Sequence, residues 1–188
     1  MLLTSKIAFV ALLLTGLGLA LRNYLIYLRT ARRVHDLADA LSASFAHEAG
    51  RDLLKWRAGA YAHEMSLHRT AWGGVERLTL ALQNGQERPV CRLVARASKA
   101  DQPTVGPHAL GHSRFDAQGR VIGITNPGVR DRLLDGSRAD TVVRLFKQGF
   151  DEIELNGKSV IASRQRSFNA EVLNAEQVNE WVKWLAEL

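Results

Sequence analysis

The chain has 188 residues, of which 46% are hydrophobic and 23% charged, enough for one ordinary domain beside an N-terminal segment. Five of its 25 basic residues and none of its 19 acidic residues lie in the first 33 positions, so the rest carries 20 basic against 19 acidic residues. The net charge of +6 therefore does not come from a basic binding face, and no nucleic acid is expected as a partner. The single Cys91 excludes an internal disulfide.

An uncharged run of fifteen residues, 7–21, lies between Lys6 and Arg22. As a helix this run covers about 22 Å, and the residues before it extend the span toward the roughly 30 Å of a bilayer core. We expect Lys6 and Arg22 to direct their charges to the headgroups at the two ends, and an interfacial turn to carry Tyr24 and Tyr27. Residues 1–28 are therefore predicted to form a transmembrane anchor with an interfacial end.

Arginines follow this run on one side only. The residues expected at the membrane interface are Lys6, Arg22, Tyr24, Tyr27, Arg29, Arg32 and Arg33. By the positive-inside rule, the arginine-rich side stays in the cytoplasm, which places the N-terminus outside and the following domain inside. Each arginine near an anionic leaflet contributes about 1 kcal/mol, so a bilayer with anionic headgroups is an expected partner. The excess of arginine over lysine is typical of GC-rich bacteria. We therefore expect a bacterial protein that crosses the inner membrane once.

A cleaved signal peptide is the alternative for the first segment. Gly18-Leu19-Ala20 resembles a small-x-small cleavage site, and cleavage there would export the rest of the chain. Signal peptides, however, carry positive charge before the apolar run, whereas here one lysine precedes it and four arginines follow. We therefore expect a retained anchor.

Apolar residues recur at spacings of three and four after the arginines, which indicates one face of a helix. They are Val34, Leu37, Leu41 and Phe45. A juxtamembrane helix is therefore predicted for 29–50, ending at Gly50, and a cytoplasmic domain for 51–188.

Alternation of apolar and polar residues then predicts strands. It appears in 78–82 and again in 90–98, with turn residues between them, which predicts a β-hairpin with a longer loop. The segment 113–126 is typical of a further strand, and Asn126-Pro127 predicts the start of a short helix.

The clearest signals lie in the last third of the chain. Ser137 and Gly149 bracket a predicted helix, Asn156-Gly157 separates two strand-like runs, and Asn174 is a predicted N-cap for a terminal amphipathic helix. Hairpins with separate helices, without regular strand-helix-strand alternation, predict an α+β fold with a mainly antiparallel sheet.

The stretch "RFDAQGRV…NPGVRDRLLDG…IELNGKSV", followed by the capped terminal helix, resembles the C-terminal half of bacterial single-span membrane-anchored proteins of unknown function. The likeness covers about 75 residues from Arg114 onward, and the single N-terminal span is similar too. It implies an anchored α+β domain and brings no catalytic residues to carry over.

Histidines offer the only candidate metal chemistry. His63 and His68 in "HEMSLH" are five residues apart, whereas the zinc-peptidase motif needs four, so we exclude that site. His108 and His112 are four apart, but no further ligands follow at suitable spacing, so no metal site and no cofactor are predicted. Trp184 lies at the margin of the apolar face of the last helix and is the candidate for contact with a partner.

These observations predict a non-enzymatic, single-span membrane protein whose cytoplasmic domain binds or helps assemble a membrane-associated protein partner. A membrane-anchored hydrolase or metal enzyme using the histidines at 108 and 112 is the alternative. An exported domain after signal cleavage is a further alternative.

Overall fold

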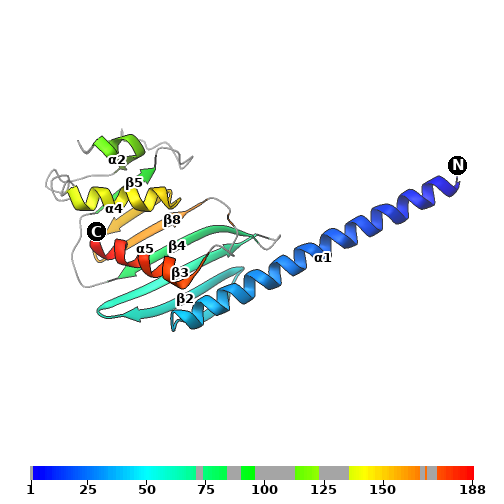
Figure 1. The fold of residues 1–188 in the computed structure, drawn as a ribbon, viewed down its shortest axis with the longest axis horizontal. Helices are drawn as coiled ribbons and strands as arrows, with labels where there is room; N and C mark the ends of the chain where they lie inside the picture. Colours follow the sequence, from blue (N-terminus) through cyan, green and yellow to red (C-terminus); the bar gives the residue numbers. More distant parts are fainter. Residues whose placement is uncertain are drawn as a thin grey trace.

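The computed structural model describes residues 2–70, 74–83, 90–95, 113–122, 136–165, 168 and 173–188, and of residues 2–6 and 8 it describes the backbone alone. A long N-terminal helix, α1 (Leu2–Ala40), extends from a body built of one antiparallel sheet and shorter helices (Figure 1). The predicted α+β class is confirmed.

The sheet has eight strands in the order β1-β2-β3-β4-β8-β7-β5-β6, and every neighbouring pair is antiparallel. The strands are β1 (Ser44–Glu48), β2 (Arg51–Ala58), β3 (Tyr61–Arg69), β4 (Val75–Gln83), β5 (Cys91–Ala95), β6 (Gly119–Ile122), β7 (Glu152–Asn156) and β8 (Ser159–Arg164). The first four strands and the last four thus form two halves, which meet where β4 pairs with β8.

Tight two-residue turns fix the register of three hairpins. Between β1 and β2, Ala49 and Gly50 both have positive φ, of 47° and 76°, as a type I′ turn requires. Gly59 and Gly157, with φ of 60° and 55°, take the first loop position of the β2–β3 and β7–β8 hairpins, which suits type II′ turns. The hairpin predicted at Asn156-Gly157 is therefore confirmed.

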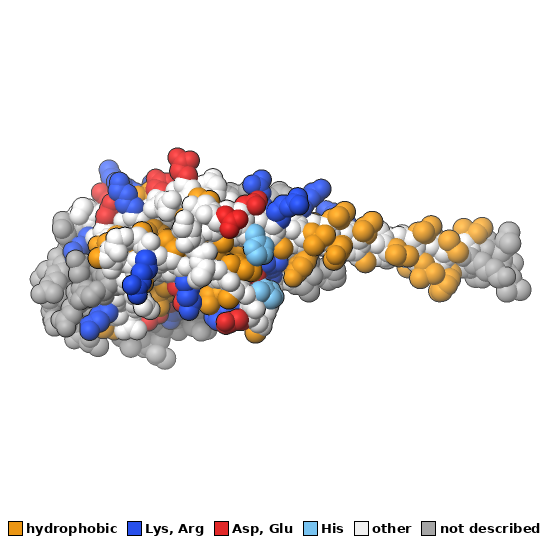
Figure 2. All heavy atoms as spheres, turned by 90° about the horizontal axis from the view of Figure 1, so that it is seen from below, with side chains coloured by type: hydrophobic (Ala, Val, Ile, Leu, Met, Phe, Trp, Pro, Cys, Tyr) orange, Lys and Arg blue, Asp and Glu red, His pale blue; other side chains and the backbone are white. Residues whose placement is uncertain are grey.

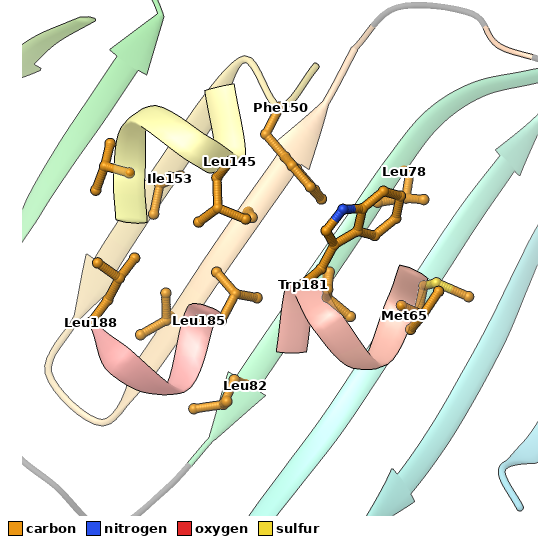
Figure 3. Close-up of a cluster of buried hydrophobic side chains, with 14 of the residues drawn as sticks. Met65, Leu78, Leu82, Leu145, Phe150, Ile153, Trp181, Leu185 and Leu188 are labelled. Carbon is orange, nitrogen blue, oxygen red and sulfur yellow. The ribbon is translucent and has the colours of Figure 1, made fainter. Parts of the chain in front are cut away.

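Helices cover one face of the sheet. They are α2 (Ser113–Gln118), α4 (Gly136–Lys147), α5 (Ala175–Glu187) and the C-terminal part of α1 (Figure 1). Beneath α5, alternate residues of β4 point toward the helices, and Leu78 and Leu82 are fully buried (Figure 3). The predicted cap of α5 is confirmed, because the Asn174 side chain accepts a hydrogen bond from the Gln177 amide at 2.8 Å. The described part of the chain places no helix on the other sheet face.

Two predictions about residues 41–50 and 78–98 are wrong. The helix predicted for 29–50 ends at Ala40, because Ser42 takes a positive φ of 51° and residues 44–48 pair with β2 as a strand. The strands β4 and β5 exist, but they do not form a hairpin with each other. Both edges of β4 are occupied, by β3 and β8, and β5 lies between β7 and β6.

The segment predicted as a strand over 113–126 begins instead with the short helix α2. Its Phe115 is fully buried and its ring contacts Phe146 of α4 at 6.2 Å between centroids. Gly119 follows, where an added Cβ would lie 2.6 Å from the Phe146 ring, so only glycine fits this crossing. Strand β6 starts there, and the helix predicted from Asn126 lies outside the described residues.

Candidate functional site

Along its length α1 passes from an exposed to a buried environment. Apart from half-buried Ile26, the apolar side chains that the structure describes from Ile7 to Leu28 are exposed, for example Leu12 at 73% and Leu17 at 67%. From Thr30 onward one stripe is buried against the sheet, and Val34 is only 1% exposed. Figure 2 shows the exposed apolar side chains on the part of α1 that extends beyond the body. The helix therefore meets the domain immediately after its apolar part.

By length and composition, α1 is long and apolar enough to cross a membrane, and it is the only such helix among the described residues. Its apolar window is entirely unburied and lies near the N-terminus. A signal sequence has the same properties, so this observation is consistent with a membrane span or with a signal.

The predicted interface residues lie on α1, whose backbone is helical without a break through Arg22. The interfacial turn predicted for Tyr24 and Tyr27 is therefore wrong, because both residues belong to a continuous helix. Arg22, Arg29, Arg32, Arg33 and Tyr24 are all exposed, and Lys6 lies near the start of the helix. Contact of these residues with a bilayer stays a prediction.

A buried ion cluster joins α1 to the sheet. Asp52 on β2 is fully buried, and its carboxylate binds His47 Nδ1 at 2.7 Å and the Arg69 guanidinium. The Arg69 guanidinium in turn lies over the ring of Tyr27 on α1, 5.0 Å from the ring centroid. Because removing a partner from a buried ion pair is costly, this cluster stabilises the contact between α1 and this end of the strands.

The sequence analysis missed this cluster. The sequence did contain a local signal for it. Asp52, Leu54 and Trp56 are alternate residues of β2 and share one face of the strand, so a carboxylate stands where the other two side chains are apolar and buried. The partner Arg69 lies seventeen residues away, and pairing at that distance became visible only once β2 and β3 were placed side by side.

His63 and His68 both lie on β3, and their odd spacing places them on opposite faces of the sheet. The exclusion of a zinc-peptidase site is consistent with this placement. His63 is 3% exposed and stacks on Trp56 at 5.2 Å between centroids. Neither of its ring nitrogens has a hydrogen-bond partner among the described residues. Burial lowers the pKa of His63 below its usual 6.5.

Acidification is expected to destabilise the domain through His63. Since the pKa of His63 is lower in the folded state than the unfolded value near 6.5, the unfolded state binds the proton more tightly. The contribution of neutral His63 to the free energy of unfolding is complete above pH 6.5. This contribution is lost as the pH falls from 6.5 toward the pKa of His63 in the folded state. The urea midpoint of unfolding, measured at pH 7.5 and at pH 5.5, tests this. The fall in the midpoint between the two pH values should be smaller in His63→Leu than in wild type, and in His68→Gln it should equal that of wild type. An unchanged shift in His63→Leu would contradict the assignment.

Cys91 is expected to be inert in the folded protein. It is 4% exposed, and burial raises the pKa of its thiol to about 12, so little thiolate forms near neutral pH. A maleimide should label it only after unfolding, which mass spectrometry across a urea series measures. Stoichiometric labelling without denaturant would show that β5 opens in the native state.

The remaining candidates are less informative. Among the described residues no group of three His, Cys, Asp or Glu side chains is placed to hold a metal ion. His108 and His112 lie outside the described residues, so the metal alternative is not tested. Trp184 is half-buried and packs against the edge of the core, while the neighbouring Trp181 is 1% exposed. Contact of Trp184 with a partner stays a prediction.

Two hollows lie beside the β2–β3 turn, at the end of the sheet away from the ion cluster. Their volumes are about 390 and 610 Å³, and they share Arg57, Ala62 and Gln83. In the smaller hollow Lys55 is paired with Glu64 at 3.3 Å. Trp56 and His63 also line the smaller hollow, and Tyr61 and Lys158 line the larger one.

No protein-family model matches this sequence, and no curated protein matches it significantly. The fold is similar to the crystal structure of the mycobacterial trehalose monomycolate transport factor A, with a TM-score of 0.59. The superposition covers 84% of this chain and 90% of that chain at 12% sequence identity. At this identity the similarity shows the fold alone.

Proposed function

We propose that this chain is a non-enzymatic, single-span membrane protein whose α+β domain lies on the cytoplasmic side of the inner membrane and binds a membrane-associated protein partner. The observation that carries the proposal is the continuity of α1, which is exposed and apolar up to Leu28 and part of the domain core from Thr30. The same helix serves as anchor and as core element.

This continuity argues against a cleaved signal. Cleavage after Ala20 would leave apolar side chains in water on a helix that the domain needs for its core. Leu21 and Tyr24 are each 59% exposed, and Leu25 and Leu28 are 46% and 44% exposed. In a retained anchor these residues lie at the interfacial end of the span, where burial of an apolar side chain of this size contributes at most about 1.5–3 kcal/mol.

The direction of insertion follows from charge, because the arginines lie on the domain side of the span. A role as a binding factor is supported by the similar fold of a protein named as a transport factor.

Alkaline extraction of membranes, followed by protease digestion of intact spheroplasts and of inverted vesicles, tests placement. We expect the protein to remain in the pellet at high pH and to be digested only in inverted vesicles. A soluble periplasmic protein lacking residues 1–20 would overturn the proposal. Mild-detergent co-purification then identifies the partner, and its loss in Trp184→Ala would support contact through that side chain.

A further inference from the structure

The larger hollow is built on one row of residues that crosses the sheet. The register aligns four residues on β2, β3, β4 and β8, and all four line the hollow: Arg57, Ala62, Gln83 and Ser159. Leu82, the neighbour of Gln83, faces the helices, so this row faces the other side of the sheet. Because Ala62 is short and lies between the longer side chains of Arg57 and Gln83, the middle of the row is left open.

The charge around the larger hollow is positive. Arg57 and Lys158 line it, and the described residues around it include no Asp or Glu. Neither cation forms an ion pair with any acidic side chain that the structure describes. The smaller hollow differs in this respect, because Glu64 is among its residues and pairs with Lys55. Two such cations beside one hollow favour an anionic ligand.

The size of the larger hollow fits a small molecule. Its volume of about 610 Å³ lies within the range of about 300–1,000 Å³ that is typical of small-molecule sites. Three strand spacings of about 4.8 Å separate β2 from β8, so the backbones of Arg57 and Ser159 lie roughly 14 Å apart. Lys158 directly precedes Ser159, so the two cations border the hollow from opposite sides. A ligand with several negative charges can contact both, whereas a single small anion contacts one at a time.

The hollow lies level with the end of α1 that is away from its apolar part. α1 ends at Ala40, and β1 then begins with Ser44, which pairs with Lys55, two residues before Arg57. From Leu28 to Ala40 the helix rises about 18 Å. The headgroup layer of one leaflet is only about 5–8 Å thick. If α1 crosses a bilayer, the hollow therefore lies beyond the headgroups and faces solution.

We propose that the larger hollow binds a soluble di- or triphosphate, either free or as part of a small molecule, and that Arg57 and Lys158 hold its phosphate groups. An arginine guanidinium binds two phosphate oxygens at once, and a lysine ammonium adds a point charge. The Ser159 hydroxyl and the Gln83 amide add uncharged hydrogen-bond donors along the same row. The choice of a soluble ligand rests on the proposed membrane anchoring, whereas the hollow and its charge do not.

Calorimetric titration of the detergent-solubilised full chain with tripolyphosphate, at constant ionic strength, tests the site. We expect one molecule to bind per chain, and to bind more tightly than inorganic phosphate. The pair Arg57→Gln and Lys158→Gln should weaken this binding about tenfold or more. The matched pair Arg77→Gln and Lys183→Gln removes the same charges from exposed positions outside the hollow, and it should bind as wild type does.

A variant that fills the hollow separates shape from charge. Ala62→Phe places a ring in the middle of the row without changing any charge, and we expect it to weaken tripolyphosphate binding about tenfold. Thr79→Phe adds the same ring to the same sheet face, four residues along β4 from Gln83, and should bind as wild type does. The urea midpoint of each variant verifies that it is folded.

Equal weakening by the two charge pairs would show attraction to overall charge alone and would overturn the site. Binding of hexaglutamate as tight as that of tripolyphosphate would also overturn it, in favour of an acidic protein segment. In nanodiscs, replacing part of the phosphatidylcholine with phosphatidylglycerol should leave tripolyphosphate binding unchanged, because about 18 Å is about two Debye lengths. Loss of binding on anionic lipid would contradict a soluble ligand. A chain that binds tripolyphosphate in detergent but does not enter nanodiscs would refute the anchoring and leave the phosphate site standing.

Discussion

Replacing Asp52 with asparagine is expected to lower the free energy of unfolding by about 3 kcal/mol. The Arg69 side chain is 6% exposed and is held by the Asp52 carboxylate, so the substitution leaves a buried guanidinium without its counter-charge. The expected loss lies at the lower end of values for buried pairs, because Arg69 also contacts Tyr27 and lies near the end of the strand. Urea unfolding of the detergent-solubilised full chain measures it.

The exposed Asp36 on α1 provides the matched control, since Asp36→Asn makes the same chemical change outside any buried pair. Its effect should stay within about 0.5 kcal/mol. A double-mutant cycle with Arg69→Gln isolates the coupling between the two side chains. If Asp52→Asn proved as mild as Asp36→Asn, the ion cluster would not stabilise the junction of α1 and the sheet.

The Trp181→Ala variant is expected to lose about 4 kcal/mol of stability. Trp181 is 1% exposed, its ring meets Phe150 edge-on at 5.1 Å between centroids, and it lies above Leu78 and Met65 of the sheet (Figure 3). Its indole N–H has no hydrogen-bond partner among the described residues, so the loss comes from packing and from the cavity left behind.

Trp184 offers a control of the same residue type on the same helix. Because it is half-buried at the edge of the core, Trp184→Ala should cost about 1 kcal/mol and leave the fold intact. The two variants therefore separate stability from binding. Equal losses of stability would show that Trp184 is a core residue, which would remove it as a candidate for partner contact.

Two local signals in the sequence, a helix cap and a tight turn, predicted local structure correctly. Asn174 acts as the N-cap of α5, and Gly157 supplies the positive φ of the β7–β8 turn. The α+β class follows from the same signals, because hairpins and capped helices were recognisable one at a time.

Structure that depends on distant residues was not predictable in this way. Phe45 continues the helical spacing of Leu41, and the break between them occurs at Ser42, whose positive φ of 51° is uncommon for a residue other than glycine. Alternation indicates that a segment is a strand but not which strand it pairs with, so β4 was assigned to β5 rather than β8. The candidate site shows the same difference. The exposed arginines of α1 were recognisable in the sequence, whereas the buried pair of Asp52 and Arg69 was not, because it forms only when β2 lies beside β3.

The order of strands also gives folding a direction. Strands β1 to β4 are consecutive in the chain, and each pairs with the strand that follows it. The second neighbour of β4 is β8, which comes much later in the chain and pairs Arg164 with Leu78. We expect the half that follows α1 to form first, which pulsed hydrogen exchange during refolding would show as earlier protection of β2 and β3 than of β7 and β8. During that interval the edge of β4 that later pairs with β8 is open, so this edge is the part of the first half that is able to pair with another chain.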